Sequence, residues 1–155
     1  MIKVQEKDFD VGAEITRLTD GNTAIGGLAC FVGLVRDLAD DKKISSMTLE
    51  HYPGMTERQL EMLETEARDR WALDEVLIIH RYGTLEPGER IVMVATASAH
   101  RGDALDSCHF LIDWLKTKAP FWKLESTEAG AQWVAANTDD DEATERWVED
   151  IRPKH

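Results

Sequence analysis

Two apolar segments with a turn signal between them constrain the fold of this chain more than any other feature. Val76–Tyr82 and Arg90–Ser98 are rich in Val, Ile and other residues that favour strands, and Pro87-Gly88 lies between them. Two strands that follow each other across such a turn usually pair antiparallel. The sequence therefore predicts an antiparallel hairpin at the centre of the fold.

A helix should follow this hairpin over residues 103–118. Apolar side chains recur there at helical spacing, at Leu105, Cys108, Leu111, Ile112 and Leu115. The helix must end near Ala119, because Pro120 disfavours helical geometry in the residue before it. Hairpins and helices without a regular β-α-β alternation predict an α+β fold.

The rest of the chain shows the same mixture of short elements. The predicted helices are Val11–Leu18, capped by Asp10, and Met55–Trp71; the predicted strands are Ala24–Val35, Ser45–Tyr52 and Phe121–Ser126; two short helices are predicted after them. No repeat or Pro-rich linker divides the chain, so residues 1–155 are expected to form a single domain with an acidic tail region at about 137–155.

The charge balance excludes several classes of partner. The 18 Lys and Arg residues against 30 Asp and Glu residues give a net charge of −12, which argues against a nucleic-acid groove and against a polybasic membrane patch. The longest uncharged run, Gly21–Val35, is too short to span a bilayer. The first residues contain no apolar export signal. We therefore expect a cytoplasmic protein that binds neither nucleic acid nor membrane.

Positive charge without acidic neighbours is concentrated at the end of the 103–118 helix and just beyond it. Lys116, Lys118 and Lys123 fall within eight residues that contain no Asp or Glu. Lys116 and Lys118 can simply complement the carbonyl end of a helix dipole, which contributes about 0.3–1 kcal/mol. Lys123 lies in an apolar strand segment, where that explanation fails. A helix end and a strand start joined by Pro120 can aim Lys116 and Lys123 at one site.

Two further positions place cationic side chains at the ends of predicted strands or helices. His100-Arg101 lies between a strand and a helix, where free helix amides, a guanidinium and an imidazole can bind an oxyanion or a phosphate. Arg36 ends the long uncharged run. The alternatives are an exposed loop at His100-Arg101 and a strand that leaves the core at Arg36.

Neither the cysteines nor the other histidines indicate a cofactor site. Cys30 and Cys108 are expected to be small apolar core residues rather than nucleophiles. His51, His80, His109 and His155 have no Cys, Asp or His at metal-ligand spacing. The sequence contains no phosphate-loop, dinucleotide or nucleophile-elbow signature. We therefore expect no metal and no bound cofactor.

Four segments together resemble a known family. They are Phe31-Val32-Gly33-Leu34-Val35-Arg36, Leu49-Glu50-His51-Tyr52-Pro53-Gly54-Met55, Ser98-Ala99-His100-Arg101 and the run from Leu115 to Glu125 that contains Lys116-Thr117-Lys118-Ala119-Pro120-Phe121-Trp122-Lys123. In this order and spacing they resemble the large, catalytic subunit of molybdopterin synthase, over about residues 24–134. The last segment is the most specific.

The resemblance implies a fold, a reaction and a partner. The fold would be of the α/β-hammerhead type. The reaction would add two sulfur atoms to cyclic pyranopterin monophosphate, giving the dithiolene molybdopterin of molybdenum cofactor biosynthesis. The sulfur donor would be the C-terminal glycine thiocarboxylate of a small ubiquitin-like subunit. Two large subunits would form a central homodimer with a small subunit at each end, a heterotetramer.

The resemblance also implies the site residues. Lys116 and Lys123 would be the catalytic groups, acting as general acids or bases and as charge stabilisers. The substrate-contacting positions would be Leu34, Val35, Arg36, His100, Arg101, Lys116, Lys123, Leu124 and Glu125. Leu34 stands where the family often has a polar or basic residue, and residues 135–137 lack the basic residue that is common there.

Two other functions use the same residues differently. A non-catalytic binding protein for a phosphorylated pterin or a similar anion would use the cations without turnover. A scaffold that only docks a ubiquitin-like protein would leave Arg36 and His100-Arg101 without a purpose. A sulfurtransferase subunit, inactive without its partner, accounts for all of these positions.

Overall fold

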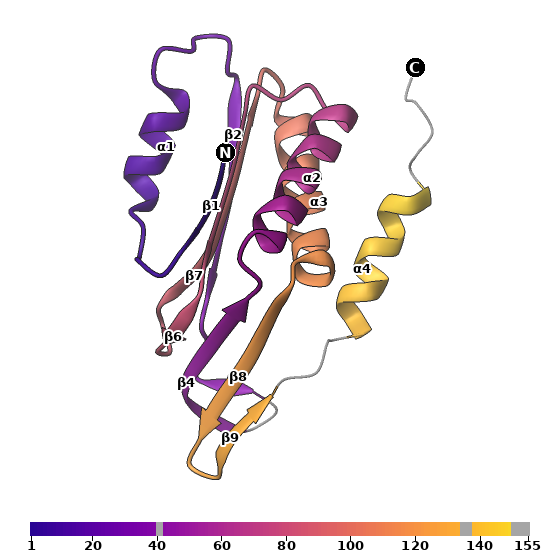
Figure 1. The fold of residues 1–155 in the computed structure, drawn as a ribbon. Coiled ribbons are helices and arrows are strands. Elements are labelled where there is room, and N and C mark those ends of the chain that lie inside the picture. The colour runs from indigo at the N-terminus through magenta and orange to yellow at the C-terminus, as the bar shows by residue number, and fades with distance from the viewer. Residues whose placement is uncertain (40–41, 134–137, 150–155) are drawn as a thin grey trace.

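The computed structural model describes residues 1–39, 42–133 and 138–149 as an α+β fold (Figure 1). Its elements, in chain order, are β1 Ile2–Gln5, α1 Val11–Thr19, β2 Gly27–Leu34, β3 Leu38–Ala39, β4 Lys42–His51, α2 Met55–Arg70, β5 Glu75–Arg81, β6 Gly83–Leu85, β7 Arg90–Ser98, α3 Arg101–Lys118, β8 Phe121–Thr127, β9 Gly130–Trp133 and α4 Thr138–Glu149. The α+β fold class predicted from the sequence is confirmed.

The first sheet is the centre of the fold. Its strand order is β1-β5-β7-β2, with β1 parallel to β5 and the other pairs antiparallel. Helices α2 and α3 cover one face and α1 covers the other (Figure 1). Ile78 and Val94 pack with Phe110 of α3 on the first face, while Ile79 packs on the opposite face. Burial on both faces explains why β5 is a continuous apolar run.

The second sheet extends from the lower end of the first in the view of Figure 1. Its order is β3-β4-β8-β9, and β6 pairs with β4 off that path. Gly54 lies between β4 and α2 with φ of +84°, a conformation that favours glycine, and its N–H donates to the Glu57 carboxylate at 2.6 Å. This bond satisfies a donor at the start of α2.

Local signals predicted most elements correctly. Asp10 caps α1 by accepting from the Ala13 N–H at 2.9 Å, as predicted. Helix α3 ends at Lys118 with Ala119 as its C-cap, immediately before Pro120. The antiparallel pairing of β5 with β7 is confirmed. The connection between them is not a short turn, because β6 lies within it and pairs with β4 in the other sheet.

Two further sequence predictions are wrong. Leu105 is 60% exposed, because the buried side of α3 is centred on Ala104, Cys108 and Leu111, about 100° around the helix. After β8 the described residues form strand β9, paired antiparallel with β8, and helix α4, rather than two short helices.

Helix α4 belongs to the core through Trp147. This side chain is 8% exposed and lies edge-on to Trp71 and Phe110. Its Nε1–H donates to Asp113 Oδ2 at 2.7 Å, so part of the predicted acidic tail is folded against α3. Residues 134–137 and 150–155, including the segment without the usual basic residue, lie outside the described residues. Within the described part, no helix is long and apolar enough to cross a membrane.

Candidate active site

The corner between α3 and β8 holds the two lysines singled out in the sequence. Lys116 is in the last turn of α3, and Lys123 is the third residue of β8. Pro120 separates the two elements, and the Phe121 N–H donates to the Ala119 carbonyl at 2.9 Å, which tightens the corner. Both lysine side chains are exposed. The structure therefore carries Lys116 and Lys123 on the two arms of one corner, both open to a ligand.

Strand β8 fixes the direction of Lys123 through its pairing with β4. Lys123 lies opposite Leu49, and Phe121 lies opposite His51. Residues opposite each other in an antiparallel pair share a face, so these four side chains lie on one face of the second sheet. Leu49 on that face is 1% exposed. The stem of Lys123 thus starts beside the core, while the side chain as a whole is exposed.

Leu124 and Glu125 continue β8 away from the corner. Leu124 pairs with Thr48 on one side and Trp133 on the other, and Glu125 lies opposite Met47. Both side chains are partly buried. Because strand residues alternate between faces, Glu125 shares the face of Lys123 and Leu124 does not.

The end of β2 forms a second part of the site. Val35, Arg36, Asp37, Pro87 and Gly88 line an open depression of about 560 Å³. The Val35 N–H donates to the Glu89 carbonyl at 2.9 Å and the Gly88 N–H donates to the Val35 carbonyl at 2.8 Å, so the Pro87-Gly88 turn holds this segment in place. Leu34, before a register shift at the end of β2, is 53% exposed.

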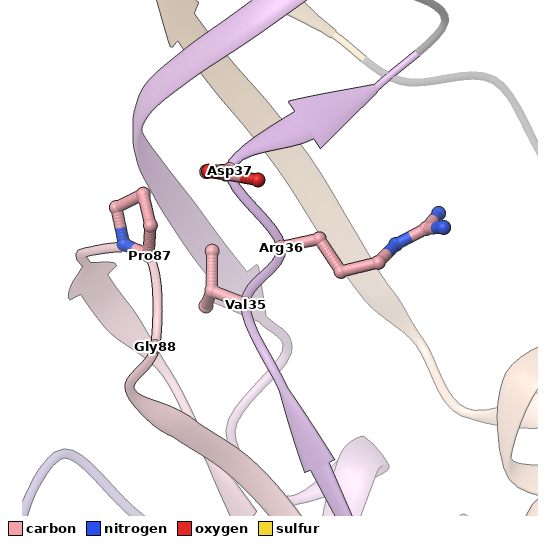
Figure 2. Close-up of a pocket in the computed structure, with 5 residues that line it drawn as sticks. All are labelled: Val35, Arg36, Asp37, Pro87 and Gly88. Carbon is pink, nitrogen blue, oxygen red and sulfur yellow. The ribbon is translucent and has the colours of Figure 1, made fainter.

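Arg36 points away from the turn that anchors its backbone. Figure 2 shows its side chain extending away from Pro87 and Gly88. Among the described residues its guanidinium has no hydrogen-bond or ion-pair partner, and it is exposed. The next residue, Asp37, accepts from the Ile44 N–H at 2.7 Å through its carbonyl, and Ile44 pairs with Thr127 of β8.

These pairings connect Arg36 through β4 to the strand that carries Lys123. Thr127 is four residues from Lys123 along β8, which is about 13 Å at the usual strand rise. The steps from Asp37 to Ile44 and from Ile44 to Thr127 add two interstrand spacings of about 5 Å each.

His100 and Arg101 lie at the start of α3, at the opposite end of this helix from Lys116. His100 is the N-cap residue of α3, and within the described chain its side chain makes no capping hydrogen bond. Both side chains are exposed, and the Arg101 Cα lies 3.8 Å from the position of a Cβ on Gly27 at the start of β2. The corner places an exposed imidazole and an exposed guanidinium at the start of α3, between a strand and a helix as the sequence predicted.

The structure separates this second cationic corner from the first. Arg101 and Lys116 lie about 22 Å apart along α3 at 1.5 Å per residue. Arg101 is beside the start of β2, whereas Arg36 follows its end, about 23 Å further on. Within one chain, Arg36 and His100-Arg101 are not brought to the same phosphate, contrary to the simplest interpretation of the sequence.

The two cysteines lie outside these clusters and are not alike. Cys108 is buried, and burial raises the pKa of its thiol to about 11. Cys30 is exposed on β2, at the edge of the first sheet, so the prediction that it is a core residue is wrong. Desolvation also raises its pKa. Neither thiol is primed as a nucleophile at neutral pH.

Sequence reasoning missed two contributors to the site. The Pro87-Gly88 turn was read only as a hairpin turn, but it supports Val35. His80 was read as an ordinary strand residue, but its ring stacks on Phe121 at a centroid distance of 3.6 Å, two residues before Lys123. Its only sequence signal is a histidine in an otherwise apolar run.

Comparisons with known proteins show the family of this chain. The family model described as MoaE protein matches residues 4–118. The molybdopterin synthase catalytic subunit of Ralstonia nicotianae is 52% identical over 146 residues, which cover 94% of this chain and 83% of that protein. The solved structure of the molybdopterin biosynthesis MoaE protein from Burkholderia ambifaria has a TM-score of 0.83 at 53% identity and covers 96% of this chain and 97% of that chain.

A more distant structure shares the fold. It is a protein–protein complex of subunits 1 and 2 of molybdopterin-converting factor from Helicobacter pylori, with a TM-score of 0.71 at 20% identity, covering 86% of this chain and 89% of that chain. The fold, the basic corner and the relatives define a transferase of molybdenum cofactor biosynthesis. The chain belongs to the MoaE family, the catalytic subunits of molybdopterin synthase.

Proposed function

We propose that this subunit converts cyclic pyranopterin monophosphate to molybdopterin with sulfur delivered by a small ubiquitin-like subunit. The sulfur would arrive as the thiocarboxylate of the partner's C-terminal glycine. The observation that carries the proposal is the placement of Lys116 and Lys123 on the two arms of the corner at Pro120. Both reagents are anionic, and this corner offers two exposed ammonium groups to them.

The residues around the corner support a division of roles. Lys116 and Lys123 would hold the thiocarboxylate and exchange protons as sulfur moves to the substrate, with Lys116 against the acyl carbon of the donor glycine. Arg36 would bind the substrate from the side of β2. Because the donor brings the sulfur, the protein needs no reactive cysteine, which agrees with the raised pKa of Cys108.

The distant His100-Arg101 corner supports a site shared between two copies. Arg101 is about 22 Å from Lys116 along α3, too far for both to contact one small substrate. A homodimer can bring His100 and Arg101 of one copy to the lysine corner of the other. With a small subunit at each lysine corner the assembly would be a heterotetramer. The Helicobacter pylori complex of two subunits is consistent with such a partner.

The lysines are tested with a control in the same helical turn. Lys118→Ala removes a cation that lies over the Trp114 ring at 5.0 Å, two residues from Lys116. We expect Lys118→Ala to retain turnover, whereas Lys116→Ala and Lys123→Ala each lose about 10²–10⁴-fold in sulfur transfer with the thiocarboxylated partner and still bind it. Full turnover of all three variants would refute the proposal.

Lys116→Arg separates catalysis from simple anion binding. A guanidinium keeps the positive charge but is a poor proton donor and cannot act as an amine. We expect Lys116→Arg to remain nearly inactive in single-turnover measurements with saturating partner. Near-normal rates would favour a binding protein for a phosphorylated pterin, with Lys116 as an electrostatic contact.

Mixing two impaired variants, at a substrate concentration too low for Arg101→Ala to turn over, tests the shared site. If each site takes Lys116 from one copy and Arg101 from the other, a mixed dimer of Lys116→Ala and Arg101→Ala subunits contains one intact site. Random exchange of the two variants would restore about a quarter of the wild-type sites. No recovery in a mixture shown to contain mixed dimers would contradict the shared site.

A further inference from the structure

His80 is a buried polar side chain that the proposed reaction does not use. It lies on β5, is 6% exposed and pairs across the sheet with Val4 and Val92. Its ring stacks on Phe121 with centroids 3.6 Å apart and planes inclined by 15°. Leucine or valine would fill such a position in an ordinary core, so the ring and its polar edge need another explanation.

The hydrogen bond of His80 fixes the orientation of its ring. Nδ1 lies 2.8 Å from the carbonyl oxygen of Arg81. A carbonyl only accepts, so Nδ1 carries the proton and donates it. Burial is the largest of the effects that together lower the pKa of His80 to about 4; the charges of Lys123 and His51 act in the same direction, and the hydrogen bond to Arg81 opposes them. The ring is therefore neutral at neutral pH. His80 is thus a flat, uncharged and rigidly held surface.

Phe121 connects this surface to the lysine corner. It is the first residue of β8, directly after Pro120, and it shares a face of the strand with Lys123 two residues later. The position of its ring therefore sets the direction in which β8 leaves α3. The positive charge of Lys123 is one of the smaller causes of the lowered pKa of His80.

A second histidine, His51, also lies against Phe121 as its cross-strand neighbour. The His51 ring is centred 5.9 Å from Phe121 and 4.5 Å from Tyr82. Its Nδ1 is 3.1 Å from the Thr56 hydroxyl, whose single proton is donated to the Tyr52 carbonyl at 2.9 Å. The hydroxyl therefore accepts from His51 Nδ1–H. Phe121 therefore contacts two imidazole rings, each of which is oriented by a hydrogen bond.

We propose that His80 is a positioning residue for Lys123 and acts through the stacked ring of Phe121. This inference rests on the proposed function only in giving Lys123 a role in turnover; the contact itself is independent of that role. The imidazole supports the start of β8 without placing a second charge beside the amine. A displacement of about 1 Å at a reacting group can cost about a hundredfold in rate, so a support of this kind affects catalysis without touching the substrate.

Two substitutions of His80 by apolar residues of similar volume distinguish the effect of ring stacking on Phe121 from the effect of merely filling the space. His80→Phe keeps a flat ring against Phe121, and His80→Leu fills the space without one. The control is Ile79→Ala, which truncates a buried neighbour on the opposite face of β5. All three are compared with the wild type as folded complexes with the small subunit and as the isolated large subunit.

The first readout is chemical and needs no turnover. Acetylation of Lys123 by acetic anhydride is followed by peptide mass spectrometry, with the exposed Lys7 as internal standard. The acetylation rate depends on the surroundings of the amine, so a displaced Lys123 should react at a different rate from the wild type. We expect such a change in His80→Leu, little change in His80→Phe, and none in Ile79→Ala.

The second readout is turnover of the complex. We expect His80→Leu to lower kcat by roughly tenfold or more with KM within about twofold, and His80→Phe to recover most of the loss. Equal acetylation of Lys123 in His80→Leu and wild type would overturn the positioning role. If acetylation changes as expected while Lys123→Ala keeps full turnover, the positioning stands and the proposed function of Lys123 fails instead.

Discussion

Mild acid should destabilise this protein through His80, and replacing His80 with phenylalanine should remove that part of the pH dependence. The imidazole has a pKa of about 4 in the folded chain, chiefly because of burial, against 6.5 for an unperturbed histidine. Between these values the unfolded chain binds a proton that the folded chain does not. The free energy of unfolding therefore falls as the pH drops below about 6.5, and this loss is complete near pH 4.

The magnitude follows from the two pKa values. One pKa unit corresponds to about 1.4 kcal/mol, so full titration of His80 can lower the free energy of unfolding by at most about 3 kcal/mol. Between pH 7 and pH 5 the expected loss is about 2 kcal/mol. Domains are stable by only about 5–15 kcal/mol, so this is a large fraction of the total.

Urea unfolding monitored by tryptophan fluorescence measures the effect, since the chain contains five tryptophans. Wild type and His80→Phe are compared at pH 7, 6 and 5. Other groups titrate in both proteins, including Asp8, whose pKa is lowered by its hydrogen bond to Arg90, and their contribution cancels in the difference. The loss between pH 7 and pH 5 should be about 2 kcal/mol smaller in His80→Phe.

Equal losses in the two proteins would refute this reasoning. A second measurement does not depend on the variant folding well: an NMR titration of the His80 ring in the wild type should show a neutral imidazole down to pH 5. A ring that takes up a proton near pH 6.5 would show that burial does not suppress its charge.

Three further predictions follow from the contacts described above. The double variant Cys30→Ala, Cys108→Ala should keep sulfur transfer with the thiocarboxylated partner, and urea unfolding should show a loss of only about 1–2 kcal/mol, mainly from the buried thiol; a folded but inactive double variant would contradict an external sulfur donor. Arg101→Ala should weaken binding of the substrate by about tenfold to a hundredfold in one calorimetric titration and leave binding of the small subunit unchanged in a second. Equal losses in the two titrations would place Arg101 at the interface with the small subunit. Trp147→Phe should lower the free energy of unfolding by about 1–3 kcal/mol, because it removes the 2.7 Å hydrogen bond to the buried Asp113 carboxylate, and unchanged thermal and urea midpoints would show that this bond contributes nothing to the docking of α4.

Local sequence signals predicted the elements because they depend on nearby residues. Asp10 caps α1, Pro120 follows the end of α3, and alternation marks β8, each through contacts within a few residues. The lysine corner was predictable for the same reason, since Lys116 and Lys123 are joined by one short connection. Chain connectivity alone keeps them together.

Tertiary structure decided everything that depends on pairing between distant segments. Cys30 has the apolar neighbours of a core residue, yet it is exposed because β2 is the last strand of its sheet. Strand β6 looked like part of a hairpin connection, but its partner is β4 in the other sheet. An apolar pattern shows which residues prefer burial and does not show which strand lies at an edge.

The division of the site was likewise set by the tertiary structure. The sequence by itself determined the candidate cations, at Arg36, His100-Arg101 and the lysine corner. Only the fold placed His100-Arg101 at the far end of α3 from Lys116, and His80 beneath Phe121. The physical reason is that distances between remote segments follow from the lengths and packing of the helices and strands between them, which side-chain patterns do not encode.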